Sequence, residues 1–426
     1  MTIFIFLGAL IGAMAIGMPI AFALLFCGVA LMIQLNMLDP SLLAQTFIFG
    51  ADNYALMAIP FFILVGELLN AGGISKRIID FGIALVGHIR GGLGYVAIIA
   101  AFIFAGLSGS AVADTAALAA ILVPMFANVG YRKSQSAALI GAGGIVAPIL
   151  PPSIPFIIFG SVAGVSIMKL FLAGIVPAIL VAVGLAITWG FLARKQKVQV
   201  YPRQNFRQIL AATRKAGMAL ILPFLIMVGI KFGIVTPTEA SVGAMFYALF
   251  LCMVLYRTVT FKQLGAILIR AAKTTSVILF LIAAAMVSSW MIAVANIPDQ
   301  VVGLLQPFLD NKMALMIAIN ILIFVVGTAM DLTPTVLILT PVLMPLVRAA
   351  HIDPVYFGVV FILNNAIGLL TPPVGTVLNA ACGAGKVRME DLMKDIWPFL
   401  LVETAVLVLL IIFPDLVLVP MHFLIG

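Results

Sequence analysis

Long, uninterrupted apolar runs are the feature of this sequence that most limits its fold. Hydrophobic residues make up 64% of the 426 positions and charged residues 9%, whereas an ordinary soluble chain has about 45–50% apolar and about 25% charged residues. Strands of a transmembrane β-barrel alternate apolar and polar residues, which these runs do not. The sequence therefore predicts an all-α polytopic membrane protein, in which spans of about 20 residues leave room for on the order of ten helices.

The basic residues fall in clusters, and these clusters predict which ends of the spans are cytoplasmic. Of the 23 Lys and Arg residues, 19 lie in five groups, and the positive-inside rule assigns such groups to the cytoplasm. The five groups occupy residues 76–90, 132–133, 194–215, 257–273 and 386–394. The net charge of +8 thus indicates topology rather than a nucleic-acid partner, and both chain termini are expected on the opposite, outer face.

Threading the chain between these basic groups predicts two halves with opposite orientations in the membrane. Residues 1–193 form the first inverted repeat, residues 194–216 a basic cytoplasmic loop, and residues 217–426 the second inverted repeat. Each repeat contains a re-entrant hairpin followed by a helix that is broken within the membrane. The hairpins are expected at about 92–131 and 312–348, and the broken helices at about 134–168 and 355–385.

One constant shift along the chain aligns the Gly and Pro residues of the two halves. It places Gly106 on Gly327, Pro124 on Pro345, Pro151 and Pro152 on Pro372 and Pro373, Gly164 on Gly385, and Pro177 on Pro398. The positions of the basic groups independently give the same two segments opposite orientations in the membrane. Inverted repeats with broken helices at corresponding places are typical of secondary transporters, whose site lies near the bilayer midplane.

The predicted hairpin tips and helix breaks carry small and polar residues, which suggests a binding site. Irregular backbone persists inside a membrane only where protein or a polar cavity supplies hydrogen-bond partners for its N–H and C=O groups. Carbonyl, hydroxyl and amide oxygens at these places suit sodium, and the N-termini of half-helices suit an anionic substrate. The sequence contains neither a clustered transition-metal ligand set nor a phosphate-binding loop, and no motif places a nucleophile beside a base, so an ATPase or another enzyme is not expected.

Structural roles compete with this interpretation. Gly and Pro are common in membrane helices, and Ser and Thr there usually bond to their own helix. Asp331 is the stronger candidate because a carboxylate at membrane depth is costly, although it also fits a cap for the helix that begins at Leu332. Asp114 equally fits a helix cap, and Glu67 and Glu403 fit either transport or pairing between helices.

Four segments carry a resemblance to a known family. They are Gly106-Leu-Ser-Gly-Ser-Ala-Val-Ala-Asp-Thr115, Pro148-Ile-Leu-Pro-Pro-Ser-Ile-Pro155, Gly327-Thr-Ala-Met-Asp-Leu-Thr-Pro-Thr335 and Leu370-Thr-Pro-Pro-Val-Gly375. In order and spacing over nearly the whole chain, they resemble the large membrane subunit of the tripartite ATP-independent periplasmic (TRAP) transporters.

This resemblance implies an elevator-type carrier in the bacterial inner membrane, with both termini in the periplasm. A scaffold of outer spans would hold a mobile transport domain made of the two hairpins and the two broken helices. The resemblance also implies coupling to Na+, without another cofactor, a small four-helix membrane partner, and a periplasmic binding protein that delivers the substrate. The family carries organic acids such as sialic acid, other sugar acids and C4-dicarboxylates.

The resemblance also implies which residues form the sites. The first sodium site would comprise Ser108, Gly109, Ser110, Gly144 and Pro148. The second would comprise Gly327, Thr328, Asp331, Gly368 and Thr371. The anion would lie between the two tips, near Ser110, Asp114, Thr115, Ser153, Thr333, Thr335, Asn365 and Thr376.

Two arms are expected to lie along the membrane faces and join the scaffold to the transport domain, between Gly73 and Arg90 and between Pro298 and Lys312. Two other transport functions stay open on the sequence alone. One is a stand-alone sodium-coupled anion symporter that needs no soluble partner, and the other is a channel, although channels rarely show paired breaks in inverted repeats.

Overall fold

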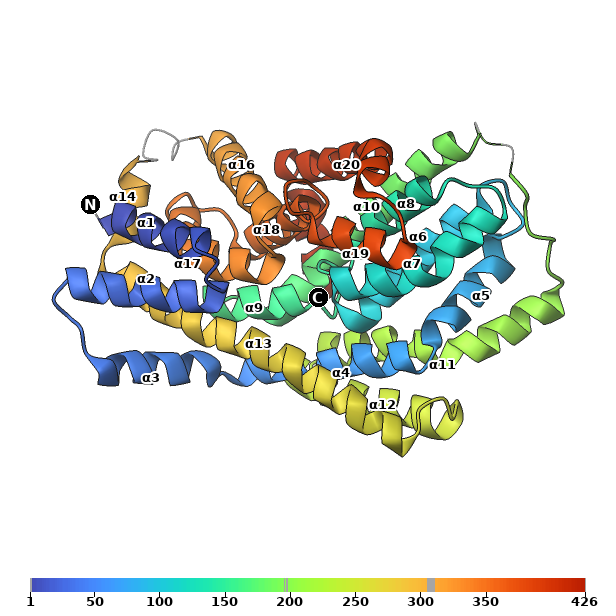
Figure 1. Cartoon of the computed structure of the whole chain (residues 1–426), viewed down its shortest axis with the longest axis horizontal. Coiled ribbons are helices and arrows are strands. Elements are labelled where there is room, and N and C mark those ends of the chain that lie inside the picture. The colour runs from blue at the N-terminus through green and yellow to red at the C-terminus, as the bar shows by residue number, and fades with distance from the viewer. Residues whose placement is uncertain (1, 195, 197, 305–310, 426) are drawn as a thin grey trace.

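The computed structural model describes residues 2–194, 196, 198–304 and 311–425, and this part of the chain is helical with short connections (Figure 1). The first half contains α1 (Thr2–Ala15), α2 (Ile20–Gln34), α3 (Pro40–Ala51), the short 3-10 helix η1 (Tyr54–Met57), α4 (Ala58–Ala71), α5 (Ile74–Val86), α6 (Gly92–Ser108), α7 (Ala111–Asn128), α8 (Lys133–Gly144), α9 (Ile154–Ala163) and α10 (Ile167–Arg194). The second half contains α11 (Phe206–Lys231), α12 (Pro237–Phe250), the π-helical turn η2 (Leu251–Leu255), α13 (Phe261–Val294), α14 (Ile297–Leu304), α16 (Lys312–Ala329), α17 (Leu332–Ala349), α18 (Pro354–Gly368), α19 (Thr376–Gly385), α20 (Met389–Ile412) and α21 (Asp415–Ile425).

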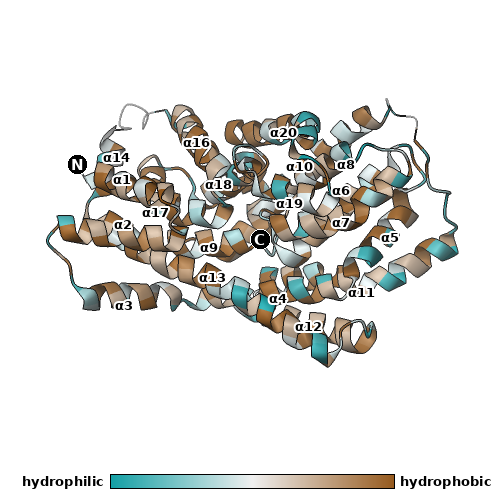
Figure 2. Cartoon of the chain, viewed as in Figure 1, coloured by the Kyte–Doolittle hydropathy of each residue, from teal (hydrophilic) through white to brown (hydrophobic). Residues whose placement is uncertain are grey.

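Hydrophobic residues predominate along most of the helices (Figure 2). Within the described residues, nine helical segments are long and apolar enough to cross a membrane. Large apolar side chains are exposed along them, for example Phe224 at 73%. An exterior of this kind suits contact with lipid rather than water, and the prediction of an all-α polytopic membrane protein is confirmed.

Several helices of the two halves begin or end at corresponding positions. The shift that places Gly106 on Gly327 also places both ends of α7 on the ends of α17, and the start of α8 on the start of α18. The hairpins thus consist of α6 with α7 and of α16 with α17, while the interrupted helices are α8 with α9 and α18 with α19. The residues that follow α9 and α19 are also alike, because Gly164 and Lys386 both adopt positive φ there.

One pair of corresponding segments differs between the halves. Helix α13 runs without interruption through 34 residues. Its counterpart under the same shift is divided, because α3 ends at Ala51 and Asn53 caps the separate turn η1, its side chain accepting a hydrogen bond from Ala55 N at 2.9 Å.

The expected basic loop at 194–216 is partly helical, which corrects the sequence interpretation, and α13 begins within the basic stretch at 257–273. Helix α11 begins at Phe206, where Asn205 N donates to Gln208 Oε1 at 2.8 Å. Helix α13 begins at Phe261, where Thr260 N donates to Gln263 Oε1 at 2.9 Å. In each case a side chain satisfies a free N–H group at the helix start, so the helix extends into the polar stretch.

The last expected span and the two expected arms also differ in detail from the prediction. The last expected span consists of two helices, since α20 ends at Ile412 and α21 follows Pro414. The expected arms contain α5 and α14, but residues 305–310 of the second arm lie outside the described residues, as do 195 and 197 of the basic loop.

The helices pack in two groups, which we call the outer group and the inner group. In the outer group, α13 packs against α2, α3 and α4, and α12 against α4 and α11 (Figure 1). In the inner group, α7 packs against α8 and α19, α16 against α18, and α17 against α9. Helix α5 contacts α11 of the outer group and α6 of the inner group, and α14 similarly contacts α13 and α17.

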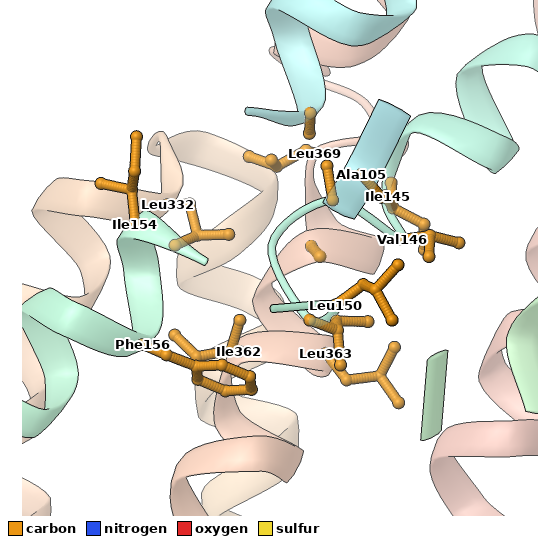
Figure 3. Packing of buried hydrophobic residues seen from close by; sticks show 14 of the residues in the cluster. Ala105, Ile145, Val146, Leu150, Ile154, Phe156, Leu332, Ile362, Leu363 and Leu369 are labelled. Carbon is orange, nitrogen blue, oxygen red and sulfur yellow. The ribbon is translucent and has the colours of Figure 1, made fainter. Parts of the chain in front are cut away.

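Apolar side chains fill the place where the hairpins meet the interrupted helices. Figure 3 shows Leu150 beside Ala105 and Val146, and Phe156 near Ile362. All of these side chains are buried. The irregular segment between α8 and α9 is therefore held inside protein, as backbone without regular hydrogen bonds requires. The segment between α18 and α19 is only partly enclosed, because Pro372, Pro373 and Val374 are exposed.

Candidate functional site

The first hairpin tip is a tight turn at Gly109. Gly109 has a φ of +64°, which favours glycine. Ser108 Oγ donates a hydrogen bond to the Asp114 carboxylate and accepts one from Ser110 N at 3.1 Å. Ser110 in turn caps α7, since its hydroxyl accepts from Ala113 N at 3.4 Å. These bonds tie the end of α6 to the first turn of α7.

This first tip lies directly against the break between α8 and α9. A Cβ atom on Gly109 would be 2.7 Å from the carbonyl oxygen of Pro152, so no larger residue fits without movement. At the other side of the hairpin, a Cβ on Gly144 would overlap Thr115 Oγ1. Ser153 Oγ donates to Pro148 O and accepts from Phe156 N at 3.2 Å, so Ser153 caps α9.

The second hairpin tip lies against the break between α18 and α19. Val374 N of this break donates to Thr328 O at 3.2 Å. Asp331 is exposed and precedes α17, but its side chain makes no capping hydrogen bond. Instead, Thr335 Oγ1 donates to the main-chain oxygen of Asp331 at 2.9 Å. The carboxylate that the sequence offered as a possible helix cap is therefore not one.

Two asparagines on α18 join the interrupted helix to the second hairpin. Asn365 Nδ2 donates to Leu332 O at 3.3 Å, and Asn364 Nδ2 donates to Asn320 O and Oδ1, each at 2.7 Å. Beyond them, Thr371 Oγ1 donates to Ile367 O at 3.1 Å. These side chains satisfy main-chain groups around the break, as membrane-embedded irregular backbone demands.

Several buried oxygen atoms around the tips and breaks have no hydrogen-bond partner among the described residues. They are Asp114 Oδ2, Thr115 Oγ1, Asn364 Oδ1, Asn365 Oδ1 and Thr376 Oγ1. A buried polar atom without a partner is costly. Together with the carbonyl groups at the ends of α8 and α18, these atoms form an oxygen-rich environment that fits a hard cation such as Na+.

Both tips open into one cavity of about 1150 Å³. Its inner-group wall comes from the first tip, the second tip and the two breaks, and its outer-group wall comes from α2 and α13. The polar and charged side chains in this lining are Ser110, Lys273, Thr274, Ser276, Asp331 and Thr333. The rest of the lining is largely apolar and includes Phe22, Ile154 and Phe280.

A smaller cavity of about 180 Å³ lies beside the first tip. Ser108, Asp114 and Glu67 line it, and it shares Ser110 and Thr274 with the larger cavity. Glu67 of α4 accepts a hydrogen bond from Arg270 Nε of α13 at 3.0 Å. This pairing of two helices is one of the two roles that the sequence left open for Glu67.

The structure brings some of the expected site residues together and separates others. Those in the lining of the large cavity are Gly109, Ser110, Pro148, Asp331 and Thr333. Those buried close behind the tips are Ser108, Asp114, Thr115, Gly144, Ser153, Gly327, Thr335, Asn365 and Gly368. Thr328, Thr371 and Thr376 lie at the second tip and break but outside the lining of this cavity.

The cavity wall formed by the outer group was not predicted from the sequence. Lys273 appeared there only as part of a cytoplasmic basic cluster, although it is the thirteenth residue of a continuous helix. No local pattern distinguishes Lys273 from Lys262 and Arg270 of the same basic stretch.

Glu403 on α20 is fully buried, and its carboxylate oxygens have no partner among the described residues.

Comparisons with known proteins give the family. The family described as "Tripartite ATP-independent periplasmic transporter, DctM component" matches residues 7–416. The chain is 52% identical to the 2,3-diketo-L-gulonate TRAP transporter large permease protein of Escherichia coli (strain K12) over 421 residues, which cover 99% of each chain. It is 36% identical to the sialic acid TRAP transporter large permease protein of Vibrio cholerae serotype O1, over 95% of each chain.

A solved structure shows the same fold at low sequence identity. The YdaH transporter of Alcanivorax borkumensis superposes with a TM-score of 0.61 at 14% identity, over 88% of this chain and 87% of that one. The family match and the near full-length relatives agree with the hairpins and interrupted helices described above. The chain is therefore a multi-pass transport protein of the bacterial inner membrane, not an enzyme, and belongs to the large permease (DctM) family of the tripartite ATP-independent periplasmic transporters.

Proposed function

We propose that this chain is the permease subunit of a sodium-coupled importer of an organic anion, working by an elevator movement. The observation that carries the proposal is the cavity that both hairpin tips reach and that α2 and α13 close. Two half-helix N-termini, those of α7 and α17, border this cavity through Ala111 and Leu332. Their positive dipole ends favour an anion.

The proposed substrate is a sugar acid. The basis is the 52% identity to the permease named for 2,3-diketo-L-gulonate, which exceeds the 36% identity to the one named for sialic acid and the 34% identity to a C4-dicarboxylate permease of Rhodobacter capsulatus. A periplasmic binding protein would deliver the acid, and a small four-helix membrane subunit would complete the transporter. Both termini of this chain would lie in the periplasm.

The proposed coupling ions are two Na+ ions, one for each tip and its neighbouring break. The first would lie among Ser108, Gly109, Ser110, Gly144 and Pro148, and the second among Gly327, Thr328, Asp331, Gly368 and Thr371. Supporting this, each tip contacts the break of its own half, and unpartnered oxygens lie beside both. Binding there would order each tip and prepare it for the anion.

The proposed moving unit is the inner group, and the outer group is the proposed scaffold. Helices α5 and α14 are suited to link the two, because each contacts helices of both groups. Moving the inner group past α2 and α13 would carry the tips and the bound anion across the membrane as one unit.

Reconstitution tests this proposal. The chain and its small subunit are placed in liposomes with or without an inward Na+ gradient and with or without the binding protein. Uptake of 2,3-diketo-L-gulonate, sialic acid and succinate is then measured. We expect saturable uptake of the sugar acid that needs both Na+ and the binding protein.

Two results would replace the proposal. Uptake that is full without any soluble partner identifies a stand-alone symporter. Flux that does not saturate and ignores the Na+ gradient identifies a channel. Preference for succinate over both sugar acids would overturn the substrate class but leave the transporter class intact.

A further inference from the structure

Lys273 is the basic side chain in the lining of the large cavity. It lies on α13, opposite the wall that contains the two hairpin tips, and it shares the lining with Ser110 of the first tip and Thr333 of the second. Lys273 lies in the polar first half of α13, three residues after Arg270, and its side chain is exposed. An exposed cation in the lining of a cavity raises the local concentration of anions there.

The protein itself supplies no carboxylate partner for Lys273 in the described part of the chain. Arg270, one turn earlier on α13, is paired with Glu67 at 3.0 Å. No carboxylate oxygen of the described residues lies within 4.0 Å of the Lys273 ammonium group. Two neighbouring cations on one helix thus differ: Arg270 is paired with Glu67 of α4, whereas Lys273 lines the cavity without forming an ion pair.

The neighbouring hydroxyls on α13 are already engaged. Thr274 Oγ1 donates to Arg270 O at 3.2 Å, and Ser276 Oγ donates to Ala272 O at 2.8 Å. On this wall, Lys273 is consequently the group with free donors for an anion. Across the cavity, Ala111 and Leu332 mark the N-termini of α7 and α17, whose dipoles have the same sign as the Lys273 charge.

We propose that Lys273 binds a carboxylate of the transported organic acid from the α13 side of the cavity, as a contact that exists only while the tips face α13. This inference rests on the proposed function, because it requires an anionic substrate. It adds that the outer group takes part in recognition. Since α13 packs against α2, α3 and α4, the contact is lost when the hairpins move past that helix, so the acid is held more tightly in this arrangement than after the movement.

Kinetics of charge variants give the first test. Lys273→Gln removes the charge, Lys273→Arg keeps it, and Lys262→Gln removes a matched exposed charge from the first turn of the same helix. Because hydrogen bonds to charged groups are the stronger ones, we expect Lys273→Gln to raise the KM for the sugar acid at least about tenfold. Lys273→Arg should restore most of the affinity, and Lys262→Gln should leave KM unchanged.

A chemical test restores the positive charge on one folded protein, so that uptake before and after the modification can be compared directly. Lys273→Cys is made in a Cys382→Ser background, since Cys27 and Cys252 are buried. Treatment with 2-aminoethyl methanethiosulfonate forms a disulfide that carries a cation and should recover uptake. Treatment with 2-sulfonatoethyl methanethiosulfonate adds an anion and should not.

Protection of the same thiol separates this inference from the proposed function. In purified protein without a Na+ gradient, 10 mM sugar acid, on the order of ten times a typical upper KM, should slow modification of the thiol, whereas a neutral sugar alcohol should not. If wild-type uptake ignores Na+ but the acid still protects, sodium coupling fails and the Lys273 contact stands. If wild-type uptake is sodium-driven but the acid gives no protection and Lys273→Gln behaves like Lys262→Gln, the contact is overturned.

One further outcome would also overturn it. Asp331 is the other charged residue in the lining. If adding Asp331→Asn to Lys273→Gln returns KM to the wild-type value, Lys273 serves to balance Asp331 and does not bind the acid. We expect the double variant to keep the raised KM.

Discussion

Gly368 on α18 packs against Gly327 on α16, main chain against main chain. A Cβ atom on Gly368 would lie 2.7 Å from the carbonyl carbon and 2.9 Å from the oxygen of Gly327. Two helices approach this closely only where neither carries a side chain, and small residues have this role in membrane helix packing. The second tip therefore lies against its break through a contact that one methyl group disrupts.

We expect Gly368→Ala to destabilise the protein by about 1–3 kcal/mol, the usual cost of overpacking, because the neighbouring atoms are main chain and cannot rotate away. Gly383→Ala is the matched control, since a Cβ there meets nothing within 4 Å. Thermal unfolding of the purified protein in detergent measures both. Equal melting temperatures for the two variants would contradict the contact.

A glycine contact in the first half of the chain, between α8 and α7, has a different chemistry and predicts rescue. A Cβ on Gly144 would overlap a side-chain atom, Thr115 Oγ1, and would lie 3.2 Å from Ala111 O. We expect Gly144→Ala to destabilise by about 1–3 kcal/mol and Thr115→Ala to recover part of that loss. A double-mutant cycle on melting temperature tests this, and strictly additive effects would show that the two residues do not meet.

The two tips are expected to govern sodium dependence. Replacing Ser110 or Asp331 by Ala removes a polar group from the cavity lining and should raise the Na+ concentration that gives half-maximal uptake by about tenfold, the value of one lost hydrogen bond to a charge. Glu390→Ala, at an exposed position in the first turn of α20, is the control. Unchanged sodium dependence in both tip variants would refute the assignment of the sodium sites.

Arg348 supports the inner group away from the cavity lined by the tips. Its Nη2 atom, near the end of α17, donates to Ala163 O at the end of α9, at 2.8 Å. A cation at a helix C-terminus also complements the helix dipole. We expect Arg348→Gln to cost about 1–2 kcal/mol of stability, and Arg207→Gln, on exposed α11 surface, to cost almost nothing. A melting temperature of Arg348→Gln equal to that of Arg207→Gln would contradict the role of this bond.

Much of the fold could be predicted because it depends on local signals. Apolar runs located the spans, and Gly109, Pro148 and Asp331 marked places where a membrane helix cannot continue. The starts of α11 and α13 were missed because the basic residues beside them were taken as loop. Asn205 with Gln208 and Thr260 with Gln263 were visible there as capping pairs.

The cavity could be predicted only in part, because its two walls come from distant segments. The wall made by the tips carries recognisable motifs, and Ser110 and Thr333 were expected in it. The residues that form the other wall depend on which face of α13 packs against the hairpins. The local sequence of α13 does not predict that face. Lys273 therefore looked like a marker of topology until the packing of α13 against α17 placed it in the cavity.

The difference between α13 and its counterpart has a mechanical consequence. At 1.5 Å per residue, 34 residues give an unbroken rod of about 51 Å, which resists bending along its whole length. The counterpart is jointed at Asp52 and Asn53, and Asn53 Nδ2 is bonded to Ser161 Oγ of α9 at 2.9 Å. The outer group thus combines an unbroken helix that bears Lys273 with a jointed segment that touches α9, so bending of this group concentrates at the joint and the lysine keeps its place.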